Sequence, residues 1–323
     1  MWIRLAHEAD AAVVAAQLQG MGLWTRPLED AQGATTGFAI ERHSATIDWQ
    51  RLATIEGVVE VQRPRSAHPS VDALAGEPVS VGALSVGPGC EPVLLSGPCA
   101  LESQAQVDEI AAAVAVAGAS ILRGGAYKPR SSPYSFSGHG EQALTWLKQA
   151  ADRHDMAVVT EVMSEADVGL VGSIADLLQI GSRNMQNFAL LRAVGAERKP
   201  VLLKRGMAAT VEEWLLAGEH LLAAGAAGVI YCARGISGFD PHTRNLLDLG
   251  AVALLSGVHR LPVVVDPSHA VGRRDLIPAL AKASLAAGAH GLMVEAHTQP
   301  ERALSDGAQA LQPDALAELG FKR

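Results

Sequence analysis

Six basic residues stand at or just after the ends of short apolar segments in the last two-thirds of the chain. Arginine binds phosphate or carboxylate through a planar fork of donors, and lysine supplies a compact charge. A single basic residue is ordinarily a solvated surface charge, but six at such positions indicate one site for a polyanion carrying more than one phosphate. These residues are Arg123, Lys128, Arg130, Arg183, Lys204 and Arg234.

A second set of side chains could bind a metal ion. It comprises Cys99, His269, Glu295 and Asp306. Mixed sulfur, nitrogen and oxygen donors suit a first-row divalent cation such as Mn, Fe, Co or Zn better than Mg or Ca. The alternatives are a small buried apolar role for Cys99, a hydrogen-bonded His269 and ordinary acids at helix starts. Glu161 and His297 are expected nearby, orienting ligands rather than binding the ion.

Eight strand-like segments, each followed by room for a helix, must position these groups. The predicted strands are 93–96, 120–123, 157–161, 176–180, 201–204, 228–232, 263–266 and 291–295. Strands buried on both faces read as continuous apolar runs, as these do. No Gly-x-Gly-x-x-Gly follows the first strand, so a (β/α)8 TIM barrel is favoured over an open dinucleotide-binding sheet. Catalytic groups of such barrels gather at the carboxyl ends of the strands.

Residues 1–63 are predicted to form a separate domain. The expected strands are 1–6, 23–28, 38–42 and 58–62, and the expected helices are 8–21 and 48–55, the second capped by Asp48. This β-α-β-β-α-β order is typical of a small ferredoxin-like α+β domain. The proline-containing residues 64–78 are predicted to be a linker, and residues 79–323 the barrel domain, with an extra hairpin at 80–86 below the barrel.

Composition excludes several classes of protein. Of 323 residues, 49% are hydrophobic and 19% charged, which excludes global disorder. The 26 basic and 34 acidic residues give a net charge of −8. This negative charge argues against a broad basic surface that binds nucleic acid. No apolar run reaches the roughly 20 residues of a membrane span, no signal peptide is visible, and three cysteines are too few for a disulfide scaffold. These features predict a cytoplasmic protein without membrane or nucleic-acid partners.

Several motifs occur in an order that matches one known family. They are Gly97-Pro98-Cys99, Leu122-Arg123-Gly124-Gly125-Ala126-Tyr127-Lys128-Pro129-Arg130, Gln179-Ile180-Gly181-Ser182-Arg183-Asn184, Leu203-Lys204-Arg205-Gly206, Asp266-Pro267-Ser268-His269 and Ser305-Asp306-Gly307. The chain resembles the type I 3-deoxy-D-arabino-heptulosonate 7-phosphate (DAHP) synthases, specifically the β subgroup with an amino-terminal ferredoxin-like domain. The match covers nearly all of residues 88–311. The family's usual Lys-Pro-Arg-Thr is Lys-Pro-Arg-Ser here, and Ser131 keeps the hydroxyl.

The resemblance implies a condensation of phosphoenolpyruvate (PEP) with D-erythrose 4-phosphate and water, which releases phosphate and opens the shikimate pathway to aromatic amino acids. It implies that Cys99, His269, Glu295 and Asp306 bind a divalent metal, Mn or else Fe, Co, Zn or Cd. It places Arg183, Lys204, Arg234, Arg123 and Lys128 on PEP, and Arg130 and Ser131 on the phosphate of erythrose 4-phosphate. Lys128 is our candidate for protonating the aldehyde oxygen. Glu161 or a metal-bound water could assist water addition. The expected catalytic group is thus Lys128, Cys99, Asp306 and Glu161.

Three questions stay open at this point. A related barrel, 3-deoxy-D-manno-octulosonate 8-phosphate (KDO8P) synthase, uses arabinose 5-phosphate, but its usual Lys-Ala-Asn-Arg is replaced here by Lys128-Pro129-Arg130. A non-catalytic barrel that binds anions is a second alternative. Residues 1–63 are either a stability or assembly module or, as the resemblance implies, an allosteric feedback domain that binds Tyr or Phe in a homotetramer.

Overall fold

The computed structural model describes residues 1–41, 44–45, 48–62, 65–128, 134 and 136–321. The chain separates into two compact units, Met1–Ala67 and His68–Arg323. No helix of the described residues is long and apolar enough to cross a membrane.

The first unit is a four-stranded antiparallel sheet with two helices, in the predicted order. Its elements are β1 (Trp2–Leu5), α1 (Ala11–Gly20), β2 (Thr25–Glu29), β3 (Thr35–Ile40), α2 (Trp49–Ala53) and β4 (Val58–Gln62). The strand order β2-β3-β1-β4 places the two strands that precede helices at the centre, as a ferredoxin-like fold requires. Asp10 and Asp48 cap α1 and α2 by accepting backbone N–H bonds, as the sequence predicted for Asp48.

The second unit contains a closed barrel of eight parallel strands, which confirms the predicted TIM barrel. The strands are β7 (Val93–Gly97), β8 (Ile121–Arg123), β9 (Ala157–Glu161), β10 (Leu177–Ile180), β11 (Pro200–Lys204), β12 (Gly228–Ala233), β13 (Val263–Val265) and β14 (Gly291–Glu295). Every predicted strand is present within one residue at each end. All their residues are buried except Ala157, Glu161 and Pro200, which are partly buried, and this explains the continuous apolar runs.

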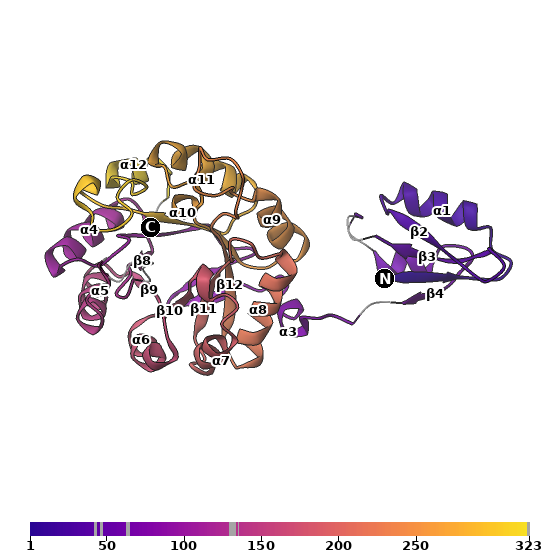
Figure 1. The fold of residues 1–323 in the computed structure, drawn as a ribbon, viewed down its shortest axis with the longest axis horizontal. Helices are drawn as coiled ribbons and strands as arrows, with labels where there is room; N and C mark the ends of the chain where they lie inside the picture. The colour runs from indigo at the N-terminus through magenta and orange to yellow at the C-terminus, as the bar shows by residue number, and fades with distance from the viewer. Residues whose placement is uncertain (42–43, 46–47, 63–64, 129–133, 135, 322–323) are drawn as a thin grey trace. The chain divides into compact units, whose positions relative to one another are not determined.

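Helices surround the strands as an outer ring (Figure 1). They are α4 (Gln104–Val116), α5 (Glu141–Arg153), α6 (Val168–Ile174), α7 (Phe188–Ala196), α8 (Val211–Ala223), α9 (Leu249–Ala253), α10 (Pro267–Val271), α11 (Ile277–Ala286) and α12 (Pro313–Ala317). Short 3-10 turns occur at η1 (Glu165–Asp167), η2 (Ser182–Asn184), η4 (Arg274–Leu276) and η5 (Pro300–Arg302), and a π-helical turn, η3 (Leu254–Val258), extends α9. Side-chain caps begin two of the long helices: Ser103 precedes α4, and a Thr210–Glu213 capping box begins α8.

A two-stranded hairpin closes the amino-terminal end of the barrel. It comprises β5 (Val79–Val81) and β6 (Leu84–Val86), and it matches the hairpin predicted at 80–86. Val79, Val81 and Val86 join the same buried cluster as the inward-facing strand residues, among them Cys232. Apolar burial therefore fills this end of the barrel, and chemistry is left to the opposite end.

The boundary between the units differs from the predicted linker at 64–78. Residues from His68 onward belong to the barrel unit, and α3 (Pro69–Asp72) packs against α8. Glu219 of α8 accepts hydrogen bonds from the backbone N–H groups of Ser70 and Val71 at 3.1 and 3.0 Å. Burial raises the pKa of Glu219, but these donors outweigh it and lower the pKa. A carboxylate 149 positions away thus orders a segment whose composition alone indicates a linker.

Candidate active site

A cavity of about 200 Å³ lies at the carboxyl ends of the barrel strands. Six basic side chains line it: Arg123, Lys128, Arg183, Lys204, Arg234 and Arg244. The first five are residues that the sequence predicted to share one site, and the structure brings them together. Arg130 and Ser131, the other two predicted substrate contacts, lie outside the described residues.

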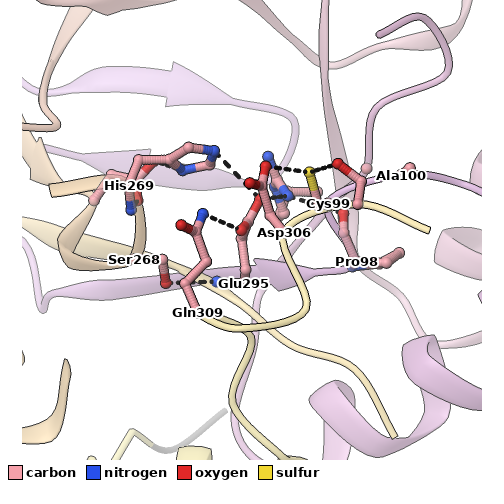
Figure 2. A network of polar contacts seen from close by, with 12 residues as sticks. Pro98, Cys99, Ala100, Ser268, His269, Glu295, Asp306 and Gln309 are labelled. Atoms are coloured by element: carbon pink, nitrogen blue, oxygen red, sulfur yellow. Dashed lines mark hydrogen bonds and ion pairs between the residues drawn. The ribbon is translucent and has the colours of Figure 1, made fainter. Parts of the chain in front are cut away.

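Two of the four candidate metal ligands, His269 and Asp306, line this cavity, and the other two, Cys99 and Glu295, lie next to them. Cys99, Glu295 and Asp306 each contribute an atom to a group whose members lie within 4.8 Å of one another. His269 joins them through its Nε2 atom, which lies 3.4 Å from Oε1 of Glu295. Figure 2 shows His269 and Cys99 directed toward the two carboxylates from opposite sides. The parallel pairing of β14 with β7 brings Glu295 beside Gly97, two residues before Cys99.

Gly97 lets the chain turn from β7 toward the rim. Its φ of 151° lies in a region that residues with a side chain rarely adopt, and a side chain here would overlap the carbonyl oxygen of Arg123. Arg123 in turn donates to the carbonyl oxygen of Pro98 at 2.9 Å. These contacts fix the backbone immediately before Cys99.

Cys99 is buried, and several polar atoms surround its sulfur. Burial, with the charge of Glu295 adding to it, raises the pKa of this thiol to about 12. The Nζ atom of Lys128 lies 2.9 Å from the sulfur, and the thiol donates to Oδ2 of Asp306 at 3.1 Å. Ser305 Oγ lies 3.1 Å away on another side. The protein alone therefore holds Cys99 as a neutral thiol, and a cation is needed to make it a thiolate.

Glu295 is fully buried yet ionised. Burial by itself raises the pKa of a carboxyl group, but the positive charges of His269, Arg123 and Lys128 outweigh it, and the pKa falls to about 2. Arg123 donates to Oε1 at 2.8 Å, and Gln309 donates to Oε2 at 2.6 Å. One sulfur, one imidazole nitrogen and two carboxylates in this arrangement fit a first-row divalent cation by their donor chemistry.

Asp266 orders two of the predicted residues at once. Its Oδ2 accepts from Nζ of Lys204 at 2.6 Å and from Nδ1 of His269 at 2.8 Å. With Nδ1 bound to Asp266, the other ring nitrogen, Nε2, is directed toward Glu295. Burial opposes ionisation of Asp266, but the charges of His269 and Lys204 keep its pKa well below the ordinary value.

The guanidinium groups in the cavity repel one another. Burial lowers the pKa of Arg234, and the charges of Arg244 and Arg183 lower it further, against the opposing effect of Asp266. A phosphate or carboxylate placed among these groups would relieve the repulsion. The electrostatics of the cavity therefore favour an anionic ligand.

Glu161 lies in the wall of the same cavity. It ends β9 and pairs with Gln179 of β10, whose Nε2 donates to Oε2 at 3.3 Å. A side chain at Gly181 would overlap Oε1 of Glu161, so glycine at this position makes room for the carboxylate. His297, by contrast, does not line the cavity and accepts the backbone N–H of Gln299 at 2.9 Å.

Some residues in these contacts had no role assigned from the sequence, among them Arg244, Gln309 and Asp266. Arg244 and Gln309 lie in long loops, and neither directly follows a strand, so their sequence positions do not indicate that they reach the site. Asp266 lies in a recognised motif beside His269, but its bond to Lys204 depends on the closeness of β11 and β13 in the barrel. Only the three-dimensional contacts reveal these roles.

The chain is similar in sequence to one protein family and to proteins of known identity. Residues 71–322 match the model of the DAHP synthetase I family. Phospho-2-dehydro-3-deoxyheptonate aldolase of Thermotoga maritima is 44% identical over 284 residues, which covers 86% of this chain and 82% of the relative. 2-dehydro-3-deoxyphosphooctonate aldolase of Acidithiobacillus ferrooxidans is 32% identical over 236 residues, or 67% of this chain and 83% of that relative.

Two solved structures share the fold. The crystal structure of the Thermotoga maritima phospho-2-dehydro-3-deoxyheptonate aldolase (DAHP synthase) aligns with a TM-score of 0.76 and 37% identity, covering 98% of this chain and 94% of that one. A truncated form of 3-deoxy-D-arabino-heptulosonate 7-phosphate synthase from Thermotoga maritima aligns with a TM-score of 0.71 and 41% identity, covering 77% of this chain and 94% of that one. The first alignment covers both units of the present chain.

Proposed function

The chain belongs to the DAHP synthetase I family and is a DAHP synthase, and we propose that the basic cavity beside Cys99 is where it acts. The reaction joins C3 of PEP to the aldehyde carbon of erythrose 4-phosphate; water adds at C2, and phosphate leaves. The observation that carries the proposal is one cavity lined by six cations and bordered by a Cys–His–Glu–Asp group.

We assign the PEP phosphate and carboxylate to Arg183, Lys204 and Arg234, with Arg123 and Lys128 completing the site. Their charges offset the repulsion between two phosphorylated substrates and hold the reacting carbons together. Orientation of this kind can supply about 7–11 kcal/mol of barrier reduction in favourable cases. Arg130 and Ser131 remain the proposed contacts for the aldose phosphate.

Lys128 is the proposed proton donor to the aldehyde oxygen. Its Nζ lies 2.9 Å from both the sulfur and the carbonyl oxygen of Cys99, which places its proton beside the candidate metal ligands. A divalent metal held by Cys99, His269, Glu295 and Asp306 would supply Lewis acidity at this oxygen. Glu161, which also lines the cavity, is the proposed base that orients the water added at C2.

Aldose preference tests the assignment. We expect phosphate release from PEP to require erythrose 4-phosphate and a divalent metal, with arabinose 5-phosphate a poor substitute. Preference for arabinose 5-phosphate would identify a KDO8P synthase, and the lower identity to the octonate enzyme already argues against this. Metal-loaded, folded protein that releases no phosphate with either aldose would support a barrel that only binds anions.

The finer properties are proposals as well. We propose manganese as the working metal, with Fe, Co, Zn or Cd as substitutes, because the proposed ligands combine a soft sulfur donor with nitrogen and hard oxygen donors. We also propose a homotetramer in which the first unit binds Tyr or Phe as a feedback effector. Calorimetry with each amino acid, on the intact chain and after removal of residues 1–67, tests this. Absence of binding to the intact chain would leave the first unit as a stability or assembly module.

A further inference from the structure

Arg244 contacts two residues of the candidate metal site at once. It lies in the loop between β12 and α9, and its side chain is 42% exposed. The Nη1 atom lies 3.5 Å from Oδ1 of Asp306 and donates to Oε1 of Gln309 at 3.3 Å. The guanidinium of Arg244 therefore contacts the candidate ligand Asp306 directly. It also contacts Gln309, which in turn contacts a second candidate ligand, Glu295.

Gln309 carries the contact onward to Glu295. It is 3% exposed, and its Nε2 donates to Oε2 of Glu295 at 2.6 Å. Ionised Glu295 can only accept, and Arg244 can only donate, so the amide has a single orientation that satisfies both neighbours. The contacts form a continuous chain from Arg244 through Gln309 to Glu295 (Figure 2 shows the Gln309–Glu295 bond).

Arg244 is itself anchored to the segment that carries His269. Its backbone N–H donates to the carbonyl oxygen of Val271 at 3.0 Å, at the end of α10. The next residue, Asn245, donates from its backbone to Ala270 and from its side chain to the carbonyl oxygen of His269 at 3.0 Å. The loop thus links the elements that hold three of the four candidate ligands.

Asp306 is the candidate ligand most in need of such support. Its side chain is 29% exposed, whereas that of Glu295 is fully buried, and its φ of 54° is unfavourable for a residue with a side chain. Arg274 holds the following backbone by donating to the carbonyl oxygens of Gly307 and Ala308. Arg244 adds the contact to the carboxylate itself.

We propose that Arg244 is a positioning residue that holds Asp306 directly, and Glu295 through Gln309, in the arrangement that binds the metal. The inference rests on the metal site of the proposed function. Residues that orient metal ligands typically change metal affinity 10- to 100-fold when they are replaced. Loss of Arg244 is therefore expected to weaken metal binding.

The test is titration of the metal-stripped full-length protein with Co²⁺, followed by the sulfur-to-cobalt charge-transfer absorption that reports a bond to Cys99. We expect Arg244→Gln to raise the Kd for Co²⁺ by 10- to 100-fold, and Arg244→Lys to restore part of the affinity. Arg273→Gln is the matched control, because it makes the same charge change in an exposed ion pair with Asp275. Its Kd should equal that of the unmodified protein.

Different failures have different meanings. An unmodified protein without the sulfur–cobalt band would refute the proposed metal site itself. A normal band with an unchanged Kd in Arg244→Gln would refute the role of Arg244, and so would an unchanged Kd accompanied by a tenfold rise in the KM for either phosphorylated substrate. Gln309→Leu gives a second route if Arg244→Gln does not fold: it should also raise the Kd, and an unchanged Kd would overturn the proposed link to Glu295.

Discussion

The Nζ atom of Lys204 lies 2.6 Å from Oδ2 of Asp266, and both side chains are buried. Asp266→Asn would leave the charge of Lys204 uncompensated and would turn an amide donor toward existing donors. Breaking a buried pair in this way costs about 3–5 kcal/mol. Denaturant unfolding of the metal-free protein measures the loss. Asp275→Asn, in the exposed pair with Arg273, should cost at most about 1 kcal/mol. Equal losses in the two variants would contradict the importance of the buried pair.

The depressed pKa of Glu295 predicts an acid-dependent stability. The pKa is about 2 in the folded protein against an ordinary 4.5, so ionised Glu295 stabilises the folded state. This contribution is fully present above pH 4.5 and is lost as the pH falls toward 2. We expect the difference in unfolding free energy between the unmodified protein and Glu295→Gln to shrink by about 2 kcal/mol from pH 5 to pH 3. A difference that is constant with pH would refute this origin of the shift.

The three cysteines should differ in reactivity. Burial raises the pKa values of Cys99 and Cys232 to about 12, so both remain thiols at pH 8. Cys90 is half-buried and accessible by comparison. Mass spectrometry of metal-free protein treated with iodoacetamide at pH 8 should find Cys90 modified first. Earlier modification of Cys99 would show that Lys128 activates this thiol despite its burial.

Lys128 should matter for turnover more than for metal binding. Lys128→Met removes the proposed proton donor, and loss of general acid catalysis typically reduces kcat by about 10²–10⁴-fold. Steady-state kinetics at saturating metal measure this effect, and Co²⁺ titration checks that the metal still binds. Lys148→Met is the control, because Lys148 lies in an exposed pair with Asp152 on α5. A kcat within a few-fold of normal for Lys128→Met would remove Lys128 from the proposed chemistry.

The barrel could be predicted because its strands are buried on both faces and its helices separate them at regular intervals. The hairpin β5–β6 and the order of the first unit followed from equally local patterns. The start of the barrel unit could not, because α3 depends on Glu219, far away in the sequence. The local composition of residues 64–78 indicates a linker, but it carries no information about the distant carboxylate of Glu219 that binds the backbone of α3.

The candidate site also combines residues that local sequence patterns predict with residues that only distant contacts place there. Residues at strand ends, such as Lys204, could be placed together once the barrel was inferred, because parallel strands share one carboxyl-end rim. Arg244 and Gln309 reach the rim from loops, and the spacing of apolar residues in the sequence does not predict the conformation of a loop. Their roles depend on contacts with Asp306 and Glu295 that only the folded chain defines.

The hairpin β5–β6 has a consequence for the order of events during turnover. Since Val79, Val81 and Val86 seal one end of the barrel with hydrocarbon, ligands of the described cavity come and go through the rim alone. Lys204 and Arg123 are buried, so a ligand bound beside them would be covered by a second ligand bound nearer the rim. We therefore expect product-inhibition kinetics of a compulsory sequence, in which the substrate that goes deepest enters first.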